Sequence, residues 1–281
     1  MKLSILVDNN SIIDRYFLAE PAVSYFIETD ELKVLFDLGY SDVFLKNARK
    51  MGIDPLSADY LVLSHGHIDH TGGLDLFIKE CVEGKMEHKR SSCPTVVGHP
   101  ELFRPKILKD RTSVGITVSE EVVEAGFEVK KTRAPLWLGK DLVFLGEIEQ
   151  SLDFEKSAPI GYRFSNDRGE WLSDDLIDDT ALAYRSPEGL VIISGCSHRG
   201  ICNIIETAKR VTGEDRVIDV VGGFHLLDPE QHRLRNTVEY FADLQLRSLH
   251  ACHCTDFRSK KALSEVAELE AVGSGMVLSY P

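Results

Sequence analysis

The sequence has no apolar run that approaches the length of a membrane span, and no basic segment followed by a cleavable apolar stretch stands at its start. Because a membrane helix needs about 20 mostly apolar residues, we expect no membrane attachment. The six cysteines are scattered, mostly inside apolar runs. These features predict a reduced, cytoplasmic protein.

Basic residues are scarce relative to acidic ones. Lys and Arg number 32 against 45 Asp and Glu, which gives a formal net charge of -13 over 281 residues. An acidic field of this size disfavours non-specific binding to nucleic acid or to anionic membranes, because both are negatively charged themselves. We therefore expect a small-molecule substrate and no nucleic-acid or membrane partner, and we leave the oligomeric state open.

Apolar residues are plentiful enough for a sizeable core. Hydrophobic residues make up 43% of the chain and aromatic residues 8%. Since α/β proteins of about 250 residues commonly form one domain, we predict a single domain over residues 1–281.

Hydrophobic patterns divide the chain into alternating strands and helices, which predicts an α/β fold. Strands are predicted at residues 2–7, 22–28, 32–37, 60–64, 95–98, 126–132, 141–148, 180–184, 189–194, 216–221, 248–253 and 276–280. Helices are predicted at residues 41–50, 200–210 and 228–244, and from residues 74 and 259 onward. Residues 84–92 are charged and predict an exposed loop that carries His88.

The segment SHGHIDHTGG at residues 64–73 concentrates potential metal ligands. It supplies three imidazoles and one carboxylate: His65, His67, Asp69 and His70. A strand before this segment would deliver these side chains onto a tight loop, where Gly66 lets the backbone turn. Imidazole and carboxylate ligands suit zinc, iron, manganese or nickel. We predict a metal site here; the alternative is a surface loop that happens to be rich in histidine.

Several further motifs follow in a fixed order. They are LFDLG at residues 35–39, ISGCSH at 193–198, VGGFH at 221–225 and HCT at 253–255. Together with SHGHIDHTGG, this set resembles the metallo-β-lactamase fold superfamily over nearly the whole chain. It resembles in particular the branch that includes the archaeal dihydropterin-ribofuranosylaminobenzene phosphate synthases and related metallo-hydrolases of unassigned substrate. The resemblance implies a four-layer αββα sandwich, in which two mixed β-sheets are flanked by helices and the site lies at one sheet edge. The strand predicted at residues 276–280 is expected to close the second sheet.

The resemblance also implies a ligand set for one or two divalent metal ions, which we expect to be zinc, with iron, manganese or nickel as alternatives. One ion is assigned to His65, His67 and His198, and the other to Asp69, His70 and His253. Asp69 is expected to be catalytic as well. Asp37 is expected to accept hydrogen bonds beneath the histidine loop and not to bind metal.

The chain departs from the family pattern where a bridging carboxylate is expected. Many members have Gly-Asp at that place, whereas this chain has Gly195-Cys196. Three explanations stay open: Asp178 or Asp179 supplies the carboxylate, His225 is a ligand instead of lining the pocket, or only one ion binds tightly. Alternation along the strand is expected to turn the cysteines on either side of His253 away from it, which predicts packing roles for Cys252 and Cys254.

Residues 84–176 are the most irregular part of the chain and predict lids and pocket walls. The resemblance places His99 at the substrate pocket, not at the metal. Arg104 and the basic residues after it suit an anionic substrate, although a solvated charge run is the alternative. Asp8 is either a turn residue or a contact of the site.

The resemblance predicts an enzyme. The expected reaction is hydrolysis of a small, anionic substrate by a metal-bound hydroxide that Asp69 helps to orient. The alternative is a pterin-methyl diphosphate:arylamine transferase, in which the metals bind the diphosphate leaving group and no activated water is needed. A third hypothesis is a non-catalytic metal-binding sensor, which predicts a less complete donor set than the six side chains found here.

Overall fold

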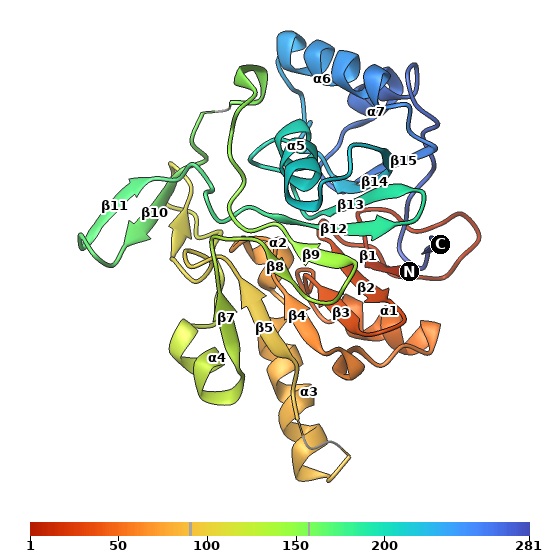
Figure 1. Ribbon diagram of the computed structural model, residues 1–281. Coiled ribbons are helices and arrows are strands. Elements are labelled where there is room, and N and C mark those ends of the chain that lie inside the picture. The colour runs from red at the N-terminus through yellow and green to blue at the C-terminus, as the bar shows by residue number, and fades with distance from the viewer. Residues whose placement is uncertain (90–91, 157) are drawn as a thin grey trace.

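A computed structural model describes residues 1–89, 92–156 and 158–281 (Figure 1). In these residues the first half of the chain builds most of a seven-stranded mixed sheet. Its strands, from edge to edge, are β16 (Val277–Ser279), β1 (Lys2–Val7), β2 (Ser24–Glu28), β3 (Lys33–Phe36), β4 (Tyr60–Val62), β5 (Thr95–Gly98) and β7 (Val129–Lys131). The strands from β3 to β7 are parallel, and the others are antiparallel.

The second half of the chain builds most of a six-stranded mixed sheet in the described residues. Its strands, from edge to edge, are β15 (Ser248–Cys252), β14 (Val217–Gly223), β13 (Gly189–Ser194), β12 (Ala181–Ser186), β9 (Leu142–Phe144) and β8 (Leu136–Trp137). The strands β13, β14 and β15 are parallel, so their carboxyl ends meet at one edge.

Helices cover the outer faces of both sheets (Figure 1). The helices α1 (Val43–Met51), α2 (Ile68–Thr71), α3 (Leu74–Met86) and α4 (Glu120–Gly126) belong to the first half, together with the short helix η1 (Pro55–Ser57). The second half contributes η2 (Asp153–Glu155), α5 (Ile201–Thr212), α6 (Gln231–Leu244) and α7 (Phe257–Leu263). The result is the four-layer αββα sandwich that the sequence predicted.

Adjacent residues of the central strands pack into different cores. In β13, Ile192 packs with the helices of the second half, whereas Ile193 packs between the two sheets. In β4, Leu61 packs with the helices of the first half, whereas Val62 also lies between the sheets. Because successive side chains of a strand point to opposite faces, strands buried on both faces are apolar along most of their length, as the runs Leu190–Ile193 and Leu61–Val62 are.

The last strand is not where the sequence analysis placed it. We expected residues 276–280 to close the second sheet, but β16 pairs antiparallel with β1 in the first sheet. The pairing aligns Lys2 with Ser279 and Leu3 with Leu278, so the two ends of the chain lie together. Hydrophobic alternation predicts a strand but not its partner, which explains the error.

Other differences lie in residues 84–176. The predicted strand at 126–132 begins later, at Val129, because the helix α4 (Glu120–Gly126) precedes it. Only Val123 of α4 is buried, so the hydrophobic pattern of this helix is weak in the sequence. The predicted loop at 84–92 begins inside α3, His88 is exposed, and residues 90 and 91 lie outside the described part. A three-stranded sheet of β6 (Lys106–Ile107), β10 (Tyr162–Ser165) and β11 (Glu170–Ser173) was not predicted, and its outer hairpin projects from the molecule (Figure 1).

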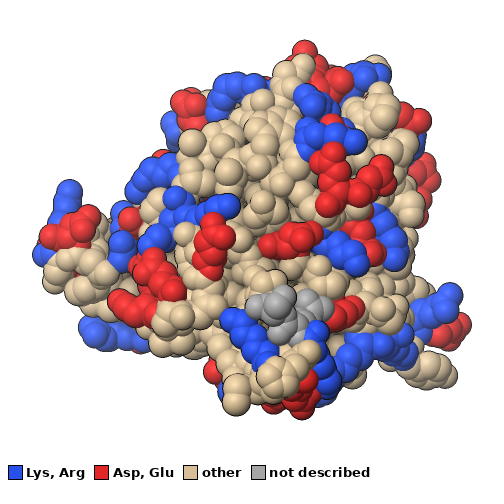
Figure 2. Space-filling view, turned by 60° about the horizontal axis from the view of Figure 1, so that its bottom comes forward, with Lys and Arg blue, Asp and Glu red and all other residues tan. Residues whose placement is uncertain are grey.

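No described helix has both the length and the apolar character needed to cross a membrane. On the face shown in Figure 2, acidic and basic side chains are interspersed.

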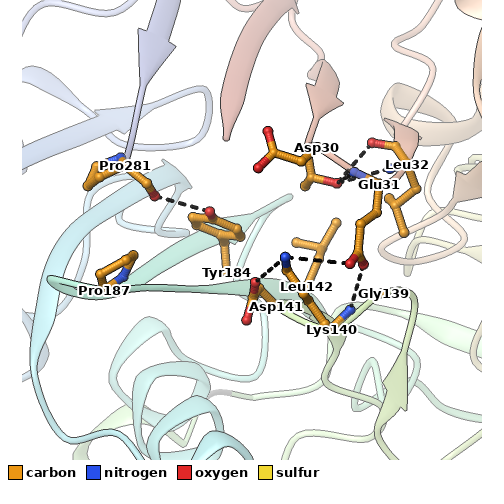
Figure 3. Close-up of a pocket in the computed structure, with 11 residues that line it drawn as sticks. Asp30, Glu31, Leu32, Gly139, Lys140, Asp141, Leu142, Tyr184, Pro187 and Pro281 are labelled. Carbon is orange, nitrogen blue, oxygen red and sulfur yellow. Dashed lines mark hydrogen bonds and ion pairs between the residues drawn. The ribbon is translucent and has the colours of Figure 1, made fainter.

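A cavity of about 210 Å³ lies at the end of the sandwich where β2 turns into β3 and β12 turns into β13 (Figure 3). Lys140 Nζ lies 3.5 Å from Glu31 Oε1 there, which links the two sheets. The Tyr184 hydroxyl donates a hydrogen bond of 3.1 Å to the carbonyl oxygen of Pro281. None of the predicted site residues lines this cavity, because those residues follow the opposite ends of β4 and β13.

Glu155, on η2, holds the start of α5. Its carboxylate accepts backbone hydrogen bonds from Cys202 at 2.9 Å and from Asn203 at 2.7 Å, and it is buried. The first N–H groups of a helix lack partners within the helix, and a carboxylate near this end also interacts favourably with the helix dipole. Glu155 therefore fixes the helix that directly follows His198.

The change Glu155→Ala leaves these buried N–H groups without an acceptor. We expect the free energy of unfolding to fall by about 1 to 3 kcal/mol, measured by urea denaturation. The control is Glu149→Ala, because the Glu149 side chain is 71% exposed; its effect should stay within about 0.5 kcal/mol. Equal effects of the two changes would contradict the capping role.

Candidate metal centre

The histidine loop begins directly after β4 and passes into the single turn of α2. Gly66 lies so close to the next segment that a Cβ atom there would stand 2.2 Å from the carbonyl oxygen of Leu102. No side chain fits at this position, so the close approach requires glycine. The loop is held against residues 102–115 by a backbone hydrogen bond of 2.9 Å from Ile68 to the carbonyl of Val114.

One group of donors gathers around Asp69. His70 Nε2 and His253 Nε2 lie 3.6 and 3.4 Å from Asp69 Oδ2. Cys196 Sγ lies 3.2 Å from each of the same two nitrogens. These four side chains come from three segments of the chain that are far apart in sequence, and all their donor atoms lie within 4.8 Å of one another. The structure thus brings Asp69, His70 and His253 together, as predicted, and adds a thiol.

The other three predicted histidines lie next to this group, and two of them, His65 and His198, form a second donor group with Cys196. His65 Nε2 lies 3.0 Å from His67 Nδ1, and the ring of His198 lies 4.8 Å from that of His65 and 4.9 Å from that of His67. Three buried nitrogens of these histidines have no hydrogen-bond partner: His67 Nε2, His198 Nδ1 and His198 Nε2. Buried polar atoms are nearly always paired, so unpaired imidazoles that face one another fit a metal site.

The electrostatics of His65, His67 and His198 favour neutral imidazoles. Burial lowers the pKa of His65 and of His198 well below the usual value, and it lowers the pKa of His67 to about 4. A neutral imidazole keeps a lone pair free, which metal binding requires. His70 differs: burial opposes its charge, but Asp69 and Asp37 together raise its pKa to about 9.

Asp37 supports the loop from beneath, as we expected. Its carboxylate accepts hydrogen bonds of 2.7 Å from both the backbone N–H and the hydroxyl of Ser64. The same carboxylate lies 2.6 Å from His70 Nδ1. A carboxylate on one ring nitrogen of a histidine fixes the ring so that the other nitrogen faces the metal, and it makes that nitrogen more basic.

Asp8 and Asn9 do the same for His253. The backbone N–H of His253 donates a 2.9 Å hydrogen bond to Asp8 Oδ1, and His253 Nδ1 lies 2.9 Å from Asn9 Oδ1. Asp8 is fully buried. The structure therefore places Asp8 behind the predicted ligand His253, where its carboxylate holds the backbone of that residue.

A cavity of about 370 Å³ opens beside the donors. Five of its lining residues are apolar or aromatic: Pro21, Tyr40, Ile68, Leu108 and Val114. The other two are His67 and Asp69. A ligand in this cavity would therefore contact apolar walls together with the side chains of His67 and Asp69.

Comparison with known proteins identifies the family. Residues 19–156 match the family model described as the metallo-beta-lactamase superfamily. The crystal structure of Tm1679, described as a metal-dependent hydrolase of the beta-lactamase superfamily, is 31% identical to this chain. That match covers 100% of this chain and 99% of the other, with a TM-score of 0.82. The chain belongs to the metallo-beta-lactamase superfamily.

Two proteins of Methanocaldococcus jannaschii also resemble this metallo-beta-lactamase superfamily member. One is a 7,8-dihydropterin-6-methyl-4-(beta-D-ribofuranosyl)-aminobenzene-5'-phosphate synthase, 29% identical over 100% of this chain and 97% of its own length. The other is the uncharacterized protein MJ0448, 29% identical over 94% of each chain. The fold, the superfamily and the expectation of an enzyme are thereby confirmed.

The two aspartates considered as replacements for the bridging carboxylate are buried beside the histidine loop. The Asp178 carboxylate accepts hydrogen bonds from the Gly66 N–H at 2.8 Å and from Lys106 Nζ at 2.9 Å. Asp179 accepts a 2.9 Å hydrogen bond from Arg199 N–H, and its other oxygen lies 4.0 Å from His65 Nδ1. Burial raises the pKa of Asp179 to about 8. Neither carboxylate belongs to a donor group of the described residues.

His225 lies at the edge of the centre. Its ring is 4.2 Å from that of His198, and it forms a third donor group with Cys196 and Cys254. It also lines a separate cavity of about 340 Å³ beneath the start of α6. Both roles considered for His225, ligand and pocket residue, therefore have structural support.

His99 and Arg104 take no part in the cavity at the metal centre. His99 Nε2 lies 3.0 Å from Glu147 Oε2, and the Nδ1 atom of His99 accepts a 3.1 Å hydrogen bond from Glu101 N–H. Arg104 Nε lies 3.6 Å from Glu101 Oε2. These contacts bind both side chains to carboxylates within residues 84–176, and neither side chain lines the cavity.

Sequence reasoning missed two cysteines. Cys196 belongs to all three donor groups, and its place in the sequence, where other members have aspartate, was the available signal. Cys254 was expected to turn away from the site, but His253 has a φ of 47°, which breaks the alternation. The Cys254 thiol donates to the Cys196 carbonyl at 3.4 Å, and its sulfur accepts from His225 N–H at 3.2 Å. Cys252 lies 3.5 Å from the hydroxyl of Tyr25 between the sheets, in the packing role predicted for it.

A buried ion cluster holds the histidine loop in place. Lys106 is 1% exposed, and its Nζ lies 2.9 Å from Asp174 and 2.9 Å from Asp178. Asp178 in turn accepts the Gly66 N–H between two predicted ligands. Burial disfavours the charged form of Asp178, but Lys106 outweighs this effect and lowers the pKa of the carboxyl. The positive charge of Lys106 is therefore neutralised by the buried carboxylates of Asp174 and Asp178.

The change Lys106→Met leaves the two buried carboxylates without a cation. We expect the free energy of unfolding to fall by about 3 to 5 kcal/mol in urea denaturation. Less metal should also survive dialysis, because Asp178 no longer holds Gly66. The control is Lys109→Met, an exposed lysine in the same segment, which should change stability by no more than about 0.5 kcal/mol. An unchanged stability of Lys106→Met would refute the role of the cluster.

Proposed function

We propose that the protein is a metal-dependent hydrolase of a small substrate that has an apolar or aromatic part. The observation that carries this proposal is the position of Asp69. Its carboxylate belongs to a metal-donor group and also lines the apolar cavity. If the scissile bond of a substrate lay beside Asp69, it would be next to the proposed metal donors, and the rest of the substrate would lie against Tyr40, Ile68 and Leu108.

Zinc is the metal that this donor set suits best, because tetrahedral sites of histidine, cysteine and carboxylate are typical of zinc. Divalent ions bound here would polarise a substrate oxygen and activate water for attack. His65, His67 and His198 would hold one ion, and Asp69, His70 and His253 the other. This number of ions is part of the proposal.

The side chains of the chain supply position and orientation. Asp69, whose side chain is 30% exposed, accepts a hydrogen bond from water in the cavity and orients it toward the substrate. Its histidine neighbours outweigh the effect of burial and lower its pKa, so it stays ionised near neutral pH. The apolar walls exclude other water and strengthen these interactions.

The substrate we propose differs from the sequence-based expectation in one respect. An anionic group of the substrate would be attracted by the metal ions, not by Arg104 and Lys106, since these are paired with Glu101, Asp174 and Asp178. The apolar cavity instead favours a neutral, flat or hydrophobic body.

A second candidate is the pterin-methyl diphosphate:arylamine transferase. Its support is the 29% identity, over 100% of this chain, to the Methanocaldococcus jannaschii synthase. An aromatic ring could stack on Tyr40, which lines the cavity and is 55% exposed. In this reaction the diphosphate would leave at the metal centre, and the arylamine would attack the methylene carbon in place of water.

Replacing either His67 or Asp69 with alanine should abolish turnover. We expect kcat/KM to fall by at least about 1000-fold, because each change removes a metal donor at the cavity. Far-ultraviolet circular dichroism should show that the fold remains. The control is Asp75→Ala, because Asp75 is exposed near the same loop and contacts only Lys79 in the described residues. A variant of His67 or Asp69 with full turnover would refute the assignment.

The two candidate reactions can be separated in one assay. Metal-loaded protein is incubated with hydroxymethyl-dihydropterin diphosphate, with and without an arylamine ribofuranoside phosphate, while diphosphate and the adduct are measured. Release that requires the acceptor and yields the adduct would establish the transferase. Without release, hydrolysis of aromatic esters, lactones and phosphodiesters is expected, and failure on all of these would contradict the hydrolase proposal.

A further inference from the structure

The sulfur of Cys196 lies at the middle of the donor cluster. Among the described residues, three groups have the spacing of metal ligands, and Cys196 is the member they share. The groups are Asp69, His70, Cys196 and His253; His65, Cys196 and His198; and Cys196, His225 and Cys254. No other side chain connects the predicted ligands of one ion with those of the other in these groups.

The distances in the first group are close to those of a metal-binding set. Zinc binds imidazole at about 2.0 to 2.1 Å and thiolate at about 2.3 Å, so neighbouring ligand atoms of a tetrahedral site lie about 3.3 to 3.7 Å apart. The distances from Asp69 to the two histidine nitrogens, 3.4 and 3.6 Å, lie in this range, and those from Cys196 Sγ to the same nitrogens, 3.2 Å each, lie just below it. Asp69, His70, Cys196 and His253 therefore approach the arrangement of a tetrahedral site.

We propose that the Cys196 thiolate is the ligand common to both metal ions and replaces the bridging carboxylate of the family. A sulfur ligand at this place makes the centre selective for thiophilic ions such as zinc, cobalt and cadmium over magnesium and manganese. The proposal goes beyond the proposed function, because it concerns the metal centre and holds for either reaction.

The backbone around Cys196 is fixed so that its sulfur has one position. A Cβ atom on Gly195 would stand 2.4 Å from Ser64 Oγ, so the turn can pass the histidine loop only at a glycine. Ser197 has a φ of 60°, and its hydroxyl donates a 2.6 Å hydrogen bond to the carbonyl of Gly223. Such left-handed residues are held in place only by surrounding contacts and often mark functional sites.

The alternative thiol, Cys254, is less suited to bridge the two ions. Its sulfur is engaged with the backbone of Cys196 and of His225, and it belongs only to the third group. A metal ion deprotonates the thiol that it binds, so Cys196 would serve as a thiolate ligand.

The Cys196 thiolate would supply the negative charge that the aspartate of other family members supplies at this position. Aspartate and a cysteine thiolate each carry one negative charge, so the net charge of the two-ion centre is the same in both cases. What changes is the chemical softness of the ligand and its susceptibility to oxidation.

The test uses cobalt(II) as a probe of sulfur ligation. Metal-free full-length protein is titrated with cobalt(II), and two quantities are measured: the near-ultraviolet thiolate-to-cobalt charge-transfer absorption, and the number of bound ions by elemental analysis after dialysis. The variants are Cys196→Ser, Cys196→Asp and Cys254→Ser. Cys202→Ser is the matched control, because Cys202 is also buried but belongs to no donor group.

The wild type, Cys254→Ser and Cys202→Ser should show the absorption band. Cys196→Ser should lose the band and bind at least one ion more weakly by about tenfold or more. Cys196→Asp should also lose the band but keep both ions, with a preference shifted toward manganese. This variant covers the case in which Cys196→Ser fails to fold, because it restores the carboxylate of the family.

Three results would overturn the proposal. They are a folded, cobalt-loaded wild type without the band, a band that persists in Cys196→Ser or Cys196→Asp, and a band lost in Cys254→Ser. None of these measurements depends on turnover, so they stand apart from the test of the proposed function.

Discussion

The Asp37 carboxylate is the contact on which the metal centre depends. It joins the end of β4, through Ser64, to the ring of His70 six residues later. Asp37 itself has a φ of 57°. This conformation costs free energy in a residue other than glycine and persists only where other contacts hold it. With Asp37 in place, the short loop cannot spread, and its side chains face the opposite sheet.

The rest of the centre follows from the meeting of two sheets. The first sheet supplies the histidine loop after β4, and the second supplies His198 after β13 and His253 after β15. Both sheets share the core that contains Phe36, Val62 and Ile193, so the ends of their strands are held at a fixed separation. The donors are therefore positioned by the packing of strands rather than by flexible loops, as a metal site requires.

Residues 84–176, between the two halves of the chain, contribute both cavity walls and a buried lysine to the surroundings of the centre. Leu108 and Val114 from this segment line the cavity, which agrees with a role in forming pocket walls. Its lysine at position 106 instead points inward and, through Asp178, holds the backbone of Gly66. A residue that looked like part of a basic surface thus stabilises the ligand loop, because burial and two carboxylates determine its role.

The sequence by itself determined the α/β class and pointed to the histidine motif at residues 64–73, because apolar strands and a dense run of histidines are local patterns. The four layers, and His198 and His253 as predicted donors, came from the resemblance to the family. The sequence did not determine the sheet that contains β16, since alternation is the same for any partner strand. It also did not reveal the positions of Cys196 and Cys254 relative to the other donors. Those depend on the left-handed backbone at Ser197 and His253, and on the contact of two sheets far apart in sequence. Only the tertiary structure could place a thiol between the two groups of histidines, because its neighbours there come from both halves of the chain.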